Sequence, residues 1–201
     1  MSIIDLNTRH TKDYSVYEAN RESLHSFIYV DNNVQFDKSS EDILILTVGS
    51  DYEKNAQKIS IPTKGIVVKP GQSIVLHTEQ KIALPQNVMG LITGLGCNIF
   101  NGGFISSGKI DQGFRGVLKV GYYNGSSQKV TFKKGSIIAC AIFFTSEATH
   151  SAQGIESPYD NAPSYSTNIR HRIIQFFCDN WVAIISLLVA VIGLFIPGGG
   201  Q

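Results

Sequence analysis

The sequence predicts a mainly β body, built as a jelly roll, sandwich or barrel, followed by one apolar C-terminal helix. Between residues 42 and 144, short runs rich in Val, Ile and Phe are separated by Gly and Pro at close intervals, which is typical of many short strands. From Trp181 to Ile196 the chain carries no charged side chain. A chain of 201 residues with 16% charged residues suits one compact domain with an appendage.

Each expected strand lies between two turn signals. Glycine supplies the backbone conformations that tight turns need, and proline fixes the backbone at their first central position. The turns are expected at Pro70-Gly71, Pro85-Gln86, Asn101-Gly102-Gly103, Asn124-Gly125 and Lys134-Gly135. The strands are expected at residues 42–48, 58–61, 66–69, 73–81, 88–93, 104–110, 115–123, 129–132 and 136–144. Residues 1–40 have a weaker pattern and form an N-terminal extension, with a short helix expected near residues 18–27.

Charge and cysteine content exclude several classes of protein. With 17 Lys and Arg against 16 Asp and Glu, the formal net charge is +1, so we expect no nucleic-acid partner. Cys97, Cys140 and Cys178 are odd in number and widely spaced, which fits neither a disulfide framework nor a zinc site. Residues 1–10 lack the apolar run of a secretory signal. The body is therefore expected in the cytosol.

The apolar C-terminal segment is expected to cross a membrane as a helix over residues 173–197. Its uncharged core, residues 181–196, would extend about 24 Å, and residues 173–177 lengthen it toward the roughly 30 Å hydrocarbon thickness. Trp181 would then lie at the lipid–water interface. Positive charge at residues 170–172 favours the cytosolic side for the preceding domain. The alternative is a fully buried core helix, for which a small strand-rich domain has little room.

These features predict three parts of the chain. Residues 1–144 form the β domain, residues 145–172 form a flexible linker rich in Ser, Thr, Asn and Pro, and residues 173–197 form a single-pass C-terminal anchor. The expected localisation is the membrane, with the N-terminal domain in the cytosol. Lipid is accordingly an expected partner, contacted through Trp181 to Ile196.

One turn carries a pattern with chemical meaning. The run G-K-I-D-Q-G-F-R-G from Gly108 to Gly116 places Asp111 in a glycine-bounded hairpin, where an aspartate is accessible and surrounded by backbone donors. An ordinary tight turn is the alternative, because Asp is a common turn residue. Two further pieces flank this run: Pro70-Gly71 with the strand that leads to Leu84-Pro85, and Lys134-Gly135 before a final apolar strand.

In this order the three pieces resemble the trimeric dUTPase and dCTP deaminase superfamily, over about half of the chain. The resemblance implies a distorted β-barrel or jelly roll and a homotrimer with nucleotide sites between subunits. It implies that the hairpin holds a pyrimidine through main-chain groups, that Asp111 contacts the deoxyribose 3'-hydroxyl or orients water, and that Phe114 packs against the sugar. Gly108 and Ile110 would shape the hairpin.

The sequence departs from the family pattern where catalysis depends on it. Gly94-Leu95-Gly96-Cys97 stands at the position of the family's phosphate-binding motif, so its arginine and hydroxyl donors are missing, and only the backbone amides of Gly94 and Gly96 are left as an anion nest. The deaminases' proton-shuttling glutamate corresponds to Gly121, which has no titratable group. The family's glutamine in the last strand corresponds to Cys140. Deamination is therefore not expected.

Other chemistry-bearing side chains have ordinary interpretations. Cys97 and Cys140 are expected to be inert core residues. His77 is expected at the surface, and Lys119 is expected to face solvent. We expect no dedicated metal site; Asp42, Glu79 and Asp111 are the carboxylates to consider for Mg²⁺, which is required only if the chain hydrolyses nucleotides.

Three functions remain. The first is a membrane-anchored nucleotide sensor or effector that has lost its chemistry and acts by membrane disruption, as in bacterial antiviral defence. The second is a membrane-tethered dUTP or dCTP pyrophosphatase that uses Asp111 and Mg²⁺. The third is a structural membrane protein without a ligand.

Overall fold

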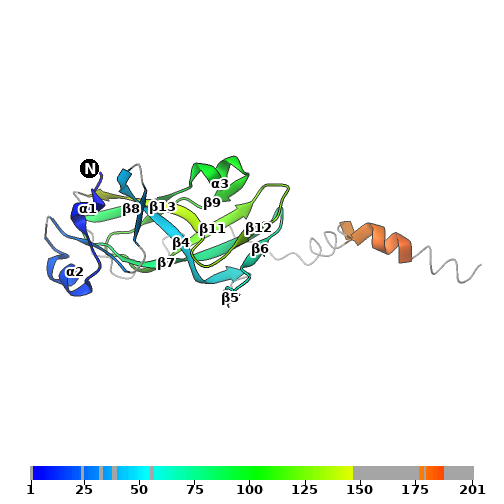
Figure 1. The fold of residues 1–201 in the computed structure, drawn as a ribbon, viewed down its shortest axis with the longest axis horizontal. Helices are drawn as coiled ribbons and strands as arrows, with labels where there is room; N and C mark the ends of the chain where they lie inside the picture. The colour runs from blue at the N-terminus through cyan, green and yellow to red at the C-terminus, as the bar shows by residue number, and fades with distance from the viewer. Residues whose placement is uncertain are drawn as a thin grey trace, which may run out of the picture. The chain divides into compact units, whose positions relative to one another are not determined.

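The computed structural model describes residues 2–23, 25–31, 34–37, 40–54, 57–146, 177–178 and 180–187. The chain divides into two compact units, Met1–Ile155 and Glu156–Gln201, and Figure 1 shows the strands gathered in the first. The first unit is mainly β, as predicted. Its helices are α1 (Leu6–Arg9), α2 (Tyr14–Asn20) and α3 (Gly96–Phe100). Its strands are β1 (His10–Thr11), β2 (Ile28–Val30), β3 (Gln35–Asp37), β4 (Ser40–Lys54), β5 (Gln57–Ser60), β6 (Ile66–Val68), β7 (Ser73–Ala83), β8 (Val88–Thr93), β9 (Gly103–Ile105), β10 (Gly108–Ile110), β11 (Arg115–Asn124), β12 (Val130–Phe132) and β13 (Ile137–Thr145).

Apart from β6 and β12, which pair with each other, the strands form two jelly-roll-like groups that share the long strand β4. In the first group, β13 pairs with the early part of β4 and with β8, and β8 pairs with β10. In the second group, β7 pairs with the late part of β4, with β2 and with β11. The register between β4 and β7 shifts between Val48 and Tyr52, and such an irregularity bends a strand. Figure 1 shows β4 running obliquely from the strands around β13 toward β5.

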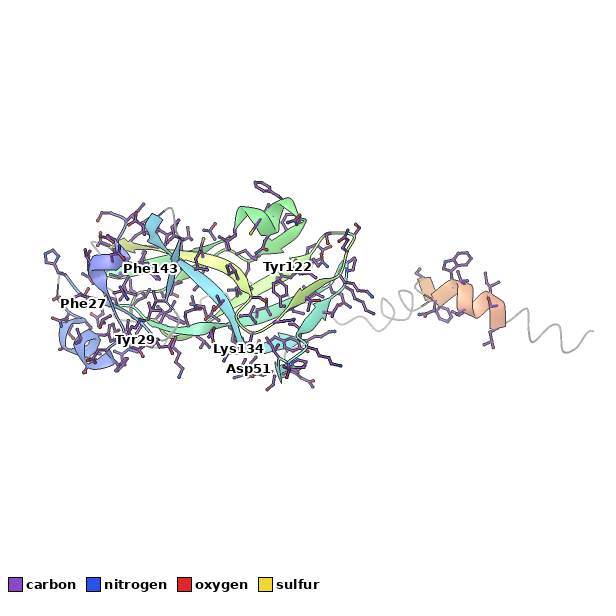
Figure 2. The ribbon with its side chains drawn as sticks, in the orientation of Figure 1. Phe27, Tyr29, Asp51, Tyr122, Lys134 and Phe143 are labelled. Carbon is purple, nitrogen blue, oxygen red and sulfur yellow. The ribbon has the colours of Figure 1, made fainter. Side chains whose placement is uncertain are left out.

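The hydrophobic core draws on both groups. Leu44 and Phe143 come from the first group, and Leu76 and Val120 come from the second. Along β7 and β11 the buried residues alternate with accessible ones over most of the strand, which is the period of a strand with one face on a core. Phe143 and Tyr122, both labelled in Figure 2, belong to this core. The other face of β7 and β11 therefore does not pack on the core over most of its length.

Most predicted strands are confirmed, but the helices differ from expectation. The early helix is α2, which starts earlier than residues 18–27, because the Asp13 carboxylate accepts from the Ser15 amide at 2.8 Å and caps it. Helix α3 was not expected. Its N-terminal cap, Leu95, makes no side-chain capping hydrogen bond, so the sequence carries no start signal for it.

The described part of the second unit is helical and apolar. Residues 177–178 and 180–187 are helical, and Trp181 is 60% exposed. Within residues 2–146, 177–178 and 180–187, apart from their undescribed gaps, no helix combines the length and the apolar character that crossing a membrane requires. Most of the predicted span 173–197 and all but two residues of the predicted linker 145–172 lie outside the described residues. Both stay predictions.

Candidate functional site

The predicted strand 104–110 is divided between the two groups of strands. Its first part, β9, pairs with β11, with Ile105 opposite Tyr122. Its second part, β10, pairs instead with β8, with Gly108 opposite Ile92. The sequence suggested a hairpin of residues 108–116, but β10 and β11 are not paired with each other. The chain leaves one group for the other at Ser106 and Ser107.

This division produces a split between β10 and β11 that is closed at both ends. At one end Ser106 donates its amide to the Gly121 carbonyl at 2.8 Å, and the Gly121 amide donates to the Ser106 hydroxyl at 2.9 Å. At the other end the Phe114 amide donates to the Asp111 carbonyl at 3.1 Å. Between these ends, among the described strands, β10 pairs only with β8, and residues 115–120 of β11 pair only with β7. Where a strand edge does not pair with a neighbouring strand, its backbone amides and carbonyls need other hydrogen-bond donors and acceptors.

The turn at the closed end presents Asp111. Gly113 has a φ of +72°, which suits the third position of this turn. The Phe114 carbonyl accepts from the Leu84 amide at 2.9 Å, so the turn is fastened to the segment after β7. The Asp111 side chain is 45% exposed and its Oδ1 lies 2.7 Å from Lys109 Nζ. An accessible carboxylate therefore stands beside the split on a fixed backbone.

The other predicted site residues have different surroundings. Ile110 is 1% exposed and belongs to the core, so it can shape the split only through its backbone. Phe114 is partly buried and packs against the core. Gly94 follows β8, and a Cβ there would lie 3.1 Å from Ile99 Cδ1, while Gly96 begins α3. Whether these residues bind a nucleotide stays a prediction.

A cavity of about 460 Å³ adjoins the Ser106 end of the split. Gly121 lies in its wall, and a Cβ at this glycine would lie 3.2 Å from the Ser106 hydroxyl. Ser106 thus occupies much of the space that a larger residue at position 121 would need. The remaining wall residues are Glu53, Lys54, Ser73, Ile74, Val75, Phe104, Ile105, Tyr122 and Tyr123.

Sequence reasoning missed a charged cluster on the face of β4, β7 and β11 that does not pack on the core. Glu53 and Gly121 both lie opposite Val75, so they belong to one row across β4, β7 and β11. Glu53 Oε1 lies 2.7 Å from Lys119 Nζ and 3.0 Å from His77 Nε2. Hydrogen bonds from Lys119 and from His77 hold the pKa of the Glu53 carboxyl below its ordinary value.

This cluster corrects one interpretation and confirms another. His77 is 6% exposed, so its expected surface position is wrong. Lys119 does point outward, but it is ion-paired with Glu53. Alternation along β7 and β11 was a usable signal for the shared face of His77 and Lys119, whereas nothing local to Glu53 indicates that β4 continues as far as this residue.

The cysteines and the carboxylates complete the chemical inventory. Cys97 is exposed, contrary to expectation, and Cys140 is buried. Glu79 lies 3.4 Å from Lys134 and accepts from the Thr47 hydroxyl. Within the described residues, no group of three or more His, Cys, Asp or Glu side chains is arranged to hold a metal ion.

The fold is mainly β and has two jelly-roll-like strand groups. The candidate site is a split beside a fixed glycine-rich turn. Together they define a class of mainly β domains with a backbone-lined site. The dUTPase family model matches residues 59–168, which is more than half of the chain, and the chain belongs to this family.

Two proteins with similar sequences are dCTP deaminases. The chain is 28% identical to a dCTP deaminase of Ignicoccus hospitalis over 111 residues, 55% of this chain and 61% of that protein. It is 29% identical to a dUMP-forming dCTP deaminase of Persephonella marina over 121 residues, 59% of this chain and 64% of that one. The chain thus spans less than two thirds of either relative.

A solved structure shares the fold. The crystal structure of the 2'-deoxycytidine 5'-triphosphate deaminase of Agrobacterium tumefaciens superposes with a TM-score of 0.53 at 12% identity, over 70% of this chain and 48% of that chain. At this identity the likeness concerns the fold alone.

Proposed function

We propose that the chain binds a deoxypyrimidine nucleotide in the split between β10 and β11. The observation that carries this proposal is the pair of strand edges without ladder partners among the described strands, closed at Ser106 and at the Asp111 turn. A pyrimidine has donors and acceptors along one edge, which backbone amides and carbonyls can match. Asp111 would accept from the sugar hydroxyl, and the ring of Phe114 would pack against the sugar. Membership of the dUTPase family supports this ligand class.

We further propose that binding occurs without turnover. Proton transfer needs a titratable group at the reacting atom, and Gly121 has none. Glu53 is on the same row, but Lys119 and His77 already engage its carboxylate. Gly94-Leu95-Gly96-Cys97 offers no cationic side chain for a triphosphate. These features support a sensor over an enzyme.

The output we propose is at the membrane. The uncharged segment from Trp181 to Ile196 would anchor the chain, with the β domain in the cytosol, and a homotrimer would gather three such helices. A nucleotide bound between subunits shifts the arrangement of the helices only by its differential affinity for the two states. Membrane permeabilisation in response to nucleotides would suit an antiviral effector.

The test is binding and turnover of dUTP and dCTP by the full-length chain in detergent with Mg²⁺. We expect calorimetry to detect binding of one of them and a pyrophosphate assay to detect no product. Asp111→Asn should weaken binding about tenfold, since it removes a charge-assisted hydrogen bond. Lys129→Gln, an exposed residue in the loop before β12, is the control.

Two results would contradict the sensor. Failure to bind any deoxynucleotide at millimolar concentration would favour the structural membrane protein. Pyrophosphate release that Asp111→Asn abolishes would establish the membrane-tethered pyrophosphatase instead. In cells, unchanged membrane potential at every nucleotide level would exclude membrane disruption as the output.

A further inference from the structure

A second cavity lies at the Asp111 end of the split. It has a volume of about 300 Å³, and Gly113 and Arg115 of the glycine-rich run lie in its wall. Tyr17, Arg21 and Gln86 also line this cavity. The N-terminal extension therefore contributes directly to a cavity beside the turn that presents Asp111.

Two guanidinium groups converge there from distant parts of the chain. Arg21 caps the C-terminus of α2, and Arg115 begins β11. Arg115 Nη1 lies 2.8 Å from Glu18 Oε1, and Arg21 Nη1 lies 3.3 Å from Glu18 Oε2. One carboxylate thus bridges both arginines. Arg21 Nη2 also lies 3.7 Å from Oε1 of Glu22, whose side chain is 73% exposed.

Arg115 is held in place by aromatic residues. Its guanidinium lies 5.7 Å from the centre of the Tyr17 ring, and its Nη1 donates to the Tyr14 hydroxyl at 3.0 Å. Tyr17 is buried and donates its hydroxyl to the Leu84 carbonyl at 3.0 Å. A guanidinium fixed in this way loses little freedom when it binds an anion.

We infer that Arg21 and Arg115 bind the phosphate group of the nucleotide in this cavity. The inference rests on the proposed function and identifies its phosphate site. The two guanidiniums already bind the two oxygens of one carboxylate, that of Glu18. They can bind the oxygens of a phosphate in the same way, because a carboxylate and a phosphate both accept paired N–H donors. Gly113 connects the cavity to the turn of Asp111 and Phe114, where the sugar is proposed to lie. Glu18 then competes with the phosphate for the same donors.

The experiment measures pyrophosphate binding by calorimetry to the full-length chain in detergent. We expect Arg21→Gln to weaken binding about tenfold, since charge-assisted hydrogen bonds are lost. Glu18→Gln should strengthen binding severalfold, because it removes the competing negative charge. Lys129→Gln, which also removes one positive charge, should leave binding unchanged; Figure 1 shows β12, next to this residue, far from α2. Circular dichroism checks that each variant is folded.

A second arm compares deoxyuridine with dUMP. We expect dUMP to bind wild type at least about tenfold more tightly than deoxyuridine, and Arg21→Gln to remove this preference while deoxyuridine binding persists. If pyrophosphate does not bind, or if Arg21→Gln binds it like wild type, the phosphate site is refuted. A Glu18→Gln variant that binds more weakly than wild type also refutes it.

The two proposals fail separately. Binding of deoxyuridine without any gain from the phosphate of dUMP leaves the nucleotide sensor standing and removes the phosphate site. Binding of pyrophosphate that depends on Arg21, without binding of any deoxynucleoside, supports an anion site and removes the nucleotide sensor.

Discussion

At the scale of single residues, the carboxylates of this chain differ in what surrounds them. Asp111 is accessible and has one lysine partner, Lys109. Glu53 receives both Lys119 and His77 at one oxygen. Glu18 bridges two arginines. Only the first environment leaves a carboxylate at the edge of the split for a sugar hydroxyl, which is why the nucleotide proposal uses Asp111.

Glu53 should make stability depend on acid pH. Its pKa is lower in the folded chain than in the unfolded chain, so its stabilisation is complete above the ordinary carboxyl pKa of about 4.3 and is lost as the pH falls through the lower folded value. The quantity to follow is the difference in free energy of unfolding between wild type and Glu53→Gln. We expect this difference to be constant from about pH 6 to 5 and to shrink below about pH 4. Urea denaturation at each pH measures it.

The control for Glu53 uses its strongest partner. In a Lys119→Gln background the same substitution should show a weaker pH dependence, because Lys119 makes the largest contribution to the lowered pKa. A difference between wild type and Glu53→Gln that does not vary with pH would show that the ion pair contributes nothing in solution.

At the scale of elements, loops are fastened by a few buried polar groups. Asn124, at the end of β11, is fully buried, and its amide nitrogen donates to the carbonyls of Val68 and Gln128 at 2.9 and 2.8 Å. Its side-chain oxygen accepts from the Ser126 amide and hydroxyl. One side chain thus joins β6, the end of β11 and the following turn. Asn124 is accordingly a structural residue.

Asn124→Ala should destabilise the domain by about 2–4 kcal/mol, because it leaves buried carbonyls without donors. Thermal and urea unfolding measure the change. Asn101→Ala is the matched control, since Asn101 is exposed and its side-chain amide donates to the nearby Cys97 carbonyl at 2.7 Å. Equal losses for the two variants would mean that burial of the Asn124 network does not matter.

At the scale of the whole molecule, the chain has a strand-rich unit and a C-terminal unit whose described residues are helical and apolar. Trp181 is the single tryptophan of the sequence. Its fluorescence therefore reports only on this segment, without interference from the β domain. The proposed anchor can be tested on the intact protein.

Adding phospholipid vesicles to the full-length chain should move Trp181 emission to shorter wavelength, because an indole ring enters the lipid interface. Ile185→Asp should abolish the shift, since an aspartate at the centre of the predicted span costs about 2.5–3.5 kcal/mol on insertion. Ile185→Leu is the control and should keep it. An emission spectrum that lipid does not change would remove the membrane from the proposed function.

Local chemistry made much of the β domain predictable. The turns at Pro70-Gly71 and Lys134-Gly135 were placed from their own residues, because glycine and proline fix backbone conformation without distant partners. The run from Gly108 to Gly116 was found in the same way, whereas Gly121 was singled out only by the resemblance to the deaminases. The length of the uncharged C-terminal segment is also a property of the sequence alone.

Only the tertiary structure decided how these pieces make a site. The division of residues 103–110 between β11 and β8 depends on strand pairing across the two groups, and no local pattern encodes that pairing. The meeting of Glu53 with Lys119, and of Arg21 with Arg115, joins residues far apart in the chain. Such contacts arise when the hydrophobic core brings separate strands and α2 together, so sequence periodicity assigns their faces but not their partners.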